Sequence, residues 1–242
     1  MSEQEIEFEE IEAGASDNEL FDQTGDFLKG PGKFVLIGIV GIAVIIGGYF
    51  AYKNYVVAPK DIKSVEALYM AEHNLLDNED YETAINGDGA TKGLEALAKS
   101  SYAGGEIAKY DLGVAYLNNG QYAEAIKTLK NVTFKDALLG TEVYGMIGDA
   151  YLESGDVNNA LKYYTKAYKN RDNEITTPLF MMKAAQCLEI EGTEKNDKGA
   201  FEKAASIYEK LIKDYPYSDQ KNDAEKYLAI VKKGKSIYNI AK

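Results

Sequence analysis

The chain has 242 residues and a formal net charge of −12. Ten acidic residues against Lys29 and Lys33 give residues 1–33 a charge of −8, so residues 34–242 carry −4. An acidic chain without a basic stripe in its sequence repels phosphate backbones, which argues against nucleic acid as a ligand.

Residues 1–33 form an acidic segment with few apolar side chains, in which like charges repel one another. This composition predicts a disordered tail. A short docking motif within it is the alternative, built from the apolar side chains of Ile6, Phe8, Ile11, Leu20 and Phe21.

Residues 34–57 are predicted to form a transmembrane helix. The run FVLIGIVGIAVIIGGYFAY, residues 34–52, contains nineteen residues without a charge. At about 1.5 Å per residue it spans nearly the ~30 Å hydrocarbon core of a bilayer. A cleaved signal peptide is the competing interpretation. The long acidic segment before the run, the length of the run and the lack of a small-x-small site after it all favour an uncleaved anchor.

Charge does not settle the orientation of this anchor. Two lysines flank its N-terminal end, whereas Lys53, Lys60 and Lys63 follow it. The positive-inside rule therefore leaves the choice open and leans, if anything, towards a cytoplasmic C-terminal domain.

Small residues recur at every fourth position of the predicted anchor, at Ala43, Gly47 and Ala51. Such a ladder allows a second membrane helix to approach closely. Glycine is also common in membrane helices that have no partner, so both interpretations stand.

Two segments in the middle of the chain repeat one pattern. GVAYLNNGQYAEAIKTL, residues 113–129, returns thirty-five positions later as GDAYLESGDVNNALKYY, residues 148–164. In the first copy, Gly113 would let a second helix come close, and Gly120 would end the first helix in the left-handed conformation. Ala125 would be the small counterpart on the second helix, and Leu129 would fill the core. The pattern predicts antiparallel helical hairpins.

These positions resemble the tetratricopeptide repeat (TPR) family, whose unit is about 34 residues long. The matching residues are Gly113, Tyr116, Ala125, Gly148, Tyr151, Ala160, Tyr164 and Ala167. We expect repeats over residues 106–140 and 141–175, a third over 178–217 with a polar insertion at 193–200, and a degenerate unit over 60–105. Residues 218–242 would supply a capping helix and a tail. The expected fold class is all-α, a transmembrane helix followed by a solenoid of helix pairs.

The sequence offers little chemistry for catalysis. A single histidine, His73, excludes a multi-histidine metal site or a histidine-based triad. Cys187 lies in an apolar stretch, which favours a buried, unreactive thiol over a nucleophile. We therefore expect no enzyme activity, no metal, no cofactor and no small-molecule substrate.

The TPR resemblance implies that ligands bind the concave groove lined by the first helix of each pair. Carried over to this sequence, the groove positions are Tyr110, Val114, Asn118, Asp149, Glu153, Met182 and Gln186. Repeats that hold acidic chaperone tails carry Lys and Asn at such places, and this chain does not. A mixed apolar and acidic groove suits an extended or helical segment with apolar anchors and positive charge.

The overall plan is similar to a group of Gram-negative bacterial proteins with a cytoplasmic tail, one membrane helix and periplasmic TPR hairpins. One relative in layout accompanies the Sec translocon and contacts periplasmic chaperones. The resemblance implies an inner-membrane scaffold with a periplasmic domain, which serves protein export or envelope biogenesis and binds the translocon, chaperones or exported chains. The alternatives are a cytoplasm-facing adaptor, an outer-membrane assembly factor, and a non-catalytic subunit of another membrane complex.

Overall fold

The computed structural model describes Gly30, residues 32–100 and residues 104–236. The predicted acidic tail over residues 1–33 lies almost wholly outside these described residues. The chain divides into two compact units, residues 1–59 and residues 60–242, and each is described by itself.

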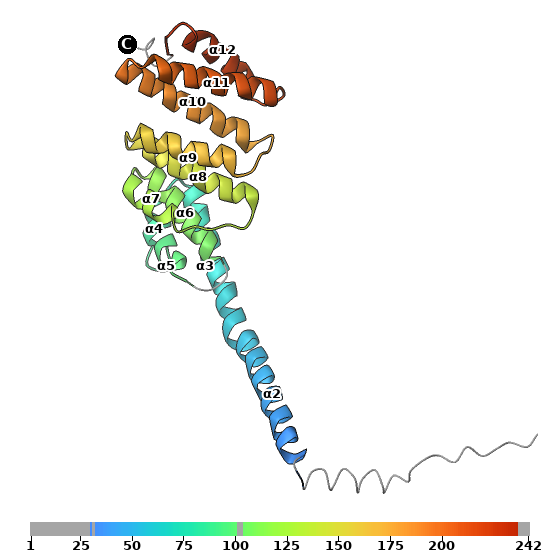
Figure 1. The fold of residues 1–242 in the computed structure, drawn as a ribbon. Helices are drawn as coiled ribbons and strands as arrows, with labels where there is room; N and C mark the ends of the chain where they lie inside the picture. Colours follow the sequence, from blue (N-terminus) through green and yellow to red (C-terminus); the bar gives the residue numbers. More distant parts are fainter. Residues whose placement is uncertain (1–29, 31, 101–103, 237–242) are drawn as a thin grey trace, which may run out of the picture. The chain divides into compact units, whose positions relative to one another are not determined.

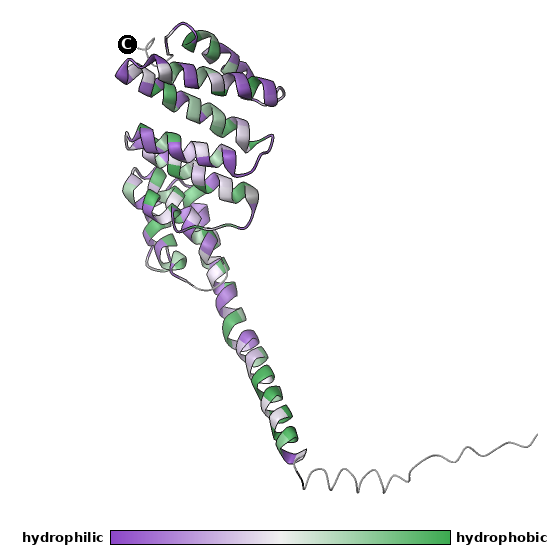
Figure 2. Ribbon diagram, viewed as in Figure 1, coloured by the Kyte–Doolittle hydropathy of each residue, from purple (hydrophilic) through white to green (hydrophobic). Residues whose placement is uncertain are grey.

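The first unit contains an apolar helix, α2 (Gly32–Tyr52), followed by one turn of π-helix, η1 (Lys53–Val57). An 18-residue window of this helical stretch has a mean hydropathy of 2.5, and none of it is buried. Figure 2 shows the long apolar run of α2. Among the described residues, this is the one helix long and apolar enough to cross a membrane. That finding rests on length and composition, and a signal sequence near the N-terminus meets the same criterion.

The small residues of the predicted helix-packing ladder, Ala43, Gly47 and Ala51, are all exposed on α2. A Cβ atom added to Gly47 would meet no other atom within 4 Å. Nothing in the described part of the chain therefore packs against this position.

The second unit is built from helices, and its described residues contain no strand beyond an isolated bridge between Gly87 and Lys92. Consecutive helices from α4 to α12 contact one another, as Figure 1 shows for the stack from α6 upward. The helices are α3 (Ala58–Leu76), α4 (Tyr81–Asn86), α5 (Leu94–Ala98), α6 (Gly105–Asn118), α7 (Tyr122–Leu129), α8 (Ala137–Glu153), α9 (Val157–Asn170), α10 (Thr176–Lys195), α11 (Lys198–Asp214) and α12 (Lys221–Val231).

Aspartate is the N-cap residue of four of these helices. Asp80, Asp136, Asp156 and Asp197 each accept a hydrogen bond from a backbone N–H in the first turn of α4, α8, α9 and α11. A carboxylate at this position satisfies a donor that has no partner within the helix and interacts favourably with the helix dipole.

The two central hairpins, α6–α7 and α8–α9, pack as the repeat predicts. A Cβ atom at Gly113 would lie 2.5 Å from Leu129, and one at Gly148 would lie 2.6 Å from Tyr164. Only glycine therefore allows the second helix to approach this closely. Gly120 and Gly155 end the first helices with φ of +74° and +83°, a backbone region that suits glycine.

The third hairpin, α10–α11, is longer than the other two. The segment expected as a polar insertion, residues 193–200, is mostly helical, because α10 continues to Lys195 and α11 begins at Lys198. Asn196 makes the turn between them with φ of +50°. The additional residues therefore lengthen both helices instead of forming a loop. The predicted cap is present, since α12 packs Ala224 and Val231 into the α10–α11 core.

The opening part of the second unit is irregular. α4 has six residues and α5 has five, and the NGDG segment between them turns with positive φ at Gly87 and Gly89. After this turn, α5 begins at Leu94. The Asp88 carboxylate accepts hydrogen bonds from the backbone N–H groups of Ala90 and Thr91 and so holds this stretch in a turn.

Candidate protein-binding groove

The first helices of the three hairpins are neighbours, because α8 contacts both α6 and α10. The seven predicted groove residues lie on these helices, from Tyr110 on α6 to Gln186 on α10. Their exposure divides them into two sets, one that faces outward and one that supports the fold.

Asp149 belongs to the supporting set. Its Oδ1 atom accepts a hydrogen bond from the Tyr164 hydroxyl at 2.6 Å and pairs with Lys183 Nζ at 2.6 Å. The three residues come from α8, α9 and α10. The side chains of Asp149 and Lys183 retain exposures of only 24% and 32%. Asp149 therefore joins two successive repeats, and both of its partners lie within the chain.

This contact also affects the tyrosine. Burial raises the pKa of Tyr164 above its usual value, and the neighbouring Asp149 carboxylate raises it further. The hydroxyl therefore stays protonated and serves as a hydrogen-bond donor.

Tyr110 and Met182 also make their contacts within the protein. Tyr110 is half-buried and makes an edge-to-face contact with Phe134, with ring centroids 5.8 Å apart. Met182 is 7% exposed and belongs to the core between α10 and α11. Both residues provide apolar support behind the groove.

The outward set consists of the other four predicted residues. Asn118 and Glu153 are exposed near the C-terminal ends of α6 and α8. Val114 and Gln186 are half-buried, which leaves part of each side chain open to a ligand. The outward set thus contains one apolar side chain, Val114, and three polar side chains.

The first helices carry further acidic groups close to this face. Burial raises the pKa of Glu142, and Asp149 adds to the effect while Lys183 opposes it. Burial also raises the pKa of Asp111 to about 7, with Glu72 of α3 contributing. Glu153 is the exposed carboxylate of the outward set, so a positively charged side chain of a partner would be favoured beside it.

Within the described ranges, no group of three or more histidine, cysteine or acidic residues could hold a metal ion. His73 is on the exposed side of α3 and contacts the Asp77 carboxylate at 2.6 Å. Cys187 is fully buried, and its burial raises the pKa of its thiol to about 12. The prediction that Cys187 is buried is confirmed.

Two features were not predicted from the sequence. One is the Asp149–Lys183 pair, although its 34-residue separation is close to the 35-residue offset of the two copies and could have revealed it. The other is a surface of lysines and tyrosines on α7, α8 and α9, assembled from residues that are scattered in the sequence.

Comparisons with known proteins agree with this architecture. The tetratricopeptide-repeat family model matches residues 110–175 and residues 146–219. No curated protein and no solved structure matched the chain in the same comparisons. The matched residues run from Tyr110 within α6 to Asp219, beyond the end of α11. The chain therefore carries tetratricopeptide repeats across residues 110–219, within an all-helical domain.

Proposed function

We propose that the chain is a membrane-anchored scaffold that binds a protein segment along the first-helix face of its repeats. Tetratricopeptide repeats imply protein–protein interaction. The observation that carries the proposal is the acidic first-helix face, where exposed Asn118 and Glu153 accompany half-buried Val114 and Gln186. The partner segment would present apolar side chains to the half-buried positions and Lys or Arg to the carboxylates.

The proposed location is the inner membrane, with residues 53–242 in the periplasm. The proposed role is in protein export or envelope biogenesis. The support is the apolar helix α2 together with the resemblance in layout described above. Translocon components, chaperones or exported chains are the proposed partners. Ala43, Gly47 and Ala51 would contact a second helix within the bilayer.

Site-specific photo-crosslinking tests the groove. A photoreactive amino acid replaces Asn118 or Glu153 in the full chain, and Glu209, exposed on α11, serves as the control position. We expect the same proteins to be crosslinked from both groove positions and not from Glu209. Equal products at all three positions, or none at the groove, would overturn the proposed binding face.

Protease treatment of spheroplasts tests the orientation, because only periplasmic segments are exposed to the enzyme. Residues 60–242 should be degraded in spheroplasts and protected in intact cells. The reverse pattern would favour an accessory subunit that faces the cytoplasm, which Lys53, Lys60 and Lys63 after the apolar run would suit.

A further inference from the structure

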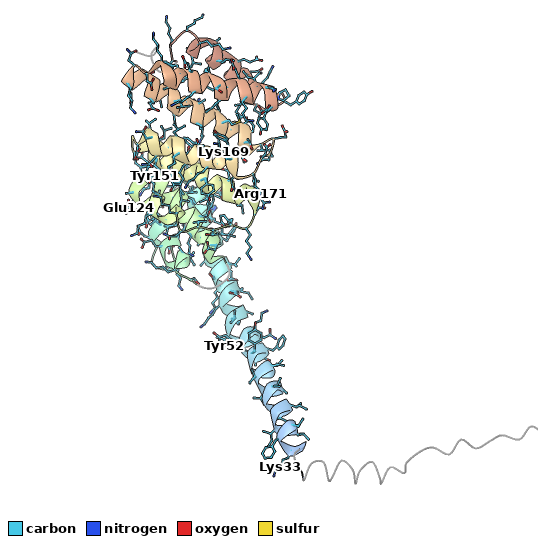
Figure 3. The ribbon with its side chains drawn as sticks, viewed as in Figure 1. Lys33, Tyr52, Glu124, Tyr151, Lys169 and Arg171 are labelled. Atoms are coloured by element: carbon cyan, nitrogen blue, oxygen red, sulfur yellow. The ribbon has the colours of Figure 1, made fainter. Side chains whose placement is uncertain are left out.

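Lysine, arginine and tyrosine side chains from α8, α9 and the segments that follow α7 and α9 form one surface. We call it the lysine–tyrosine surface, and Figure 3 labels Tyr151, Lys169 and Arg171 among its members. It consists of Lys130, Lys135, Tyr144, Tyr151, Tyr163, Lys166, Lys169 and Arg171.

At the centre of this surface, cations and rings alternate. Lys130 Nζ donates a hydrogen bond to the Tyr151 hydroxyl at 2.8 Å and lies 5.2 Å from the centroid of that ring. The Tyr151 ring stacks on Tyr163 at 5.5 Å. Lys166 Nζ lies 4.7 Å from the Tyr163 centroid and 5.9 Å from that of Tyr144. Cation–π contacts of this kind hold both ammonium groups over half-buried rings.

The surface continues from Tyr144 in two directions. Tyr144, Lys166 and Lys169 line an open hollow of about 350 Å³. Tyr144 also borders a second hollow of about 230 Å³, together with Lys135 and Arg171. The surface therefore contains five cations, which are Lys130, Lys135, Lys166, Lys169 and Arg171.

No carboxylate among the described residues forms an ion pair with any of these five cations. Four lysines of α10, α11 and α12 differ, because Lys195, Lys210, Lys221 and Lys226 each pair with an acid three or four residues away. Asp136 borders the second hollow, but its carboxylate accepts two backbone hydrogen bonds at the start of α8. The five cations of the surface thus outnumber Asp136, the carboxylate that borders its second hollow.

The geometry points to a second binding site, at which this surface holds an acidic protein segment that also carries aromatic or apolar side chains. Carboxylates of the partner would form ion pairs with the ammonium groups of Lys130 and Lys166. Its aromatic side chains would pack on the Tyr151–Tyr163 stack. This site is separate from the proposed groove, and it selects the opposite charge.

A protein segment suits the surface better than a nucleic acid. Lys53 is the only charged residue between residues 34 and 59, so residues 60–242 carry a net charge of −5. A duplex with one charge per ~1.7 Å would be repelled by the rest of this domain. A short segment with a few carboxylates would interact with the local cations alone.

Binding of a fluorescein-labelled peptide of Glu-Glu-Phe repeats to the full chain in detergent micelles tests this site. We expect the double variant Lys130→Gln/Lys166→Gln to weaken binding about tenfold, from two partly exposed charge contacts. The matched control is Lys221→Gln/Lys226→Gln, which removes the same net charge from α12. It should leave the affinity unchanged.

Three results would overturn the proposal. Equal weakening by both double variants would show that net charge alone drives binding. Equal affinity for a Gln-Gln-Phe peptide would show that the carboxylates contribute nothing. Tighter binding of a single-stranded oligonucleotide or of anionic vesicles, lost in Lys130→Gln/Lys166→Gln, would assign the surface to phosphate. Circular dichroism of each variant confirms that the helices remain folded, so that a loss of affinity reports on the surface.

Discussion

At the scale of single residues, tyrosine hydroxyls bonded to carboxylates recur through the second unit. Tyr116 donates to Glu95 at 2.7 Å, and Tyr208 donates to the buried Glu189 at 2.5 Å. The Tyr215 hydroxyl donates to Asp172 in the same way. Hydrogen bonds to an ionised acceptor are stronger than those between neutral groups. Together with Tyr164–Asp149, the Tyr116 and Tyr208 bonds join helices that are neighbours in the stack, and the Tyr215 bond joins the end of α11 to the segment between α9 and α10.

The Tyr164–Asp149 bond gives a direct test of this contribution. We expect Tyr164→Phe to lower the free energy of unfolding by about 1–2 kcal/mol, because a half-buried carboxylate loses a donor. Tyr168→Phe on the same helix is the control, since its hydroxyl has no hydrogen bond to a described residue. Chemical denaturation measured by circular dichroism gives both values. Equal losses in the two variants would contradict the prediction.

Asp111 predicts a dependence of stability on pH. Its pKa is raised to about 7 by burial and by Glu72, and in the unfolded chain it returns to about 3.9. Between these two pKa values the folded protein binds more protons than the unfolded chain. The free energy of unfolding should therefore fall as the pH rises from about 4 to 7 and then level off.

Asp111→Asn removes this titration. At about pH 8 the variant should be more stable than the wild type by roughly 1–3 kcal/mol, and at about pH 4 the two should be similar. Thermal unfolding at both pH values measures the difference. Asp219→Asn makes the same charge change at an exposed position, and an equal gain from it would attribute the effect to net charge.

At the scale of elements, two of the three glycines of α8 have opposite roles. A Cβ atom at Gly148 would lie 2.6 Å from the Tyr164 ring, whereas one at Gly140 would come no closer than 3.6 Å to any atom. Tight hairpin packing requires the first glycine, and the second only lowers the helix propensity of α8.

Alanine at these positions should therefore change stability in opposite directions. We expect Gly148→Ala to cost about 1–3 kcal/mol, because Tyr164 must move away from a close-packed site. Gly140→Ala should gain about 0.5–1 kcal/mol from helix propensity. Thermal melts of the two single variants test the pair, and destabilisation by both would show that α8 tolerates no added side chain.

At the scale of the whole molecule, sequence periodicity predicted the hairpins because the glycine and alanine positions perform one packing task in each copy. Residues 193–200 were harder to place, since polar residues can extend a helix as readily as they form a loop. The groove positions followed from the resemblance to tetratricopeptide repeats. The internal pairing of Asp149 depends on Lys183, which lies one repeat further along the chain. The lysine–tyrosine surface could not be predicted, because α7, α8 and α9 must first pack together to form it.

These two surfaces should bind independently, because they differ in charge and involve different side chains. A Lys-Lys-Phe peptide should bind the acidic first-helix face, and a Glu-Glu-Phe peptide should bind the lysine–tyrosine surface. Glu153→Gln should weaken only the first interaction, and Lys130→Gln/Lys166→Gln only the second. Titrating one labelled peptide in the presence of a saturating amount of the other measures the coupling between the sites. High salt should weaken both interactions, since exposed charges are screened beyond about 10 Å at 0.1 M. Competition between the peptides, after correction for their direct attraction in the absence of protein, would mean that they share one site.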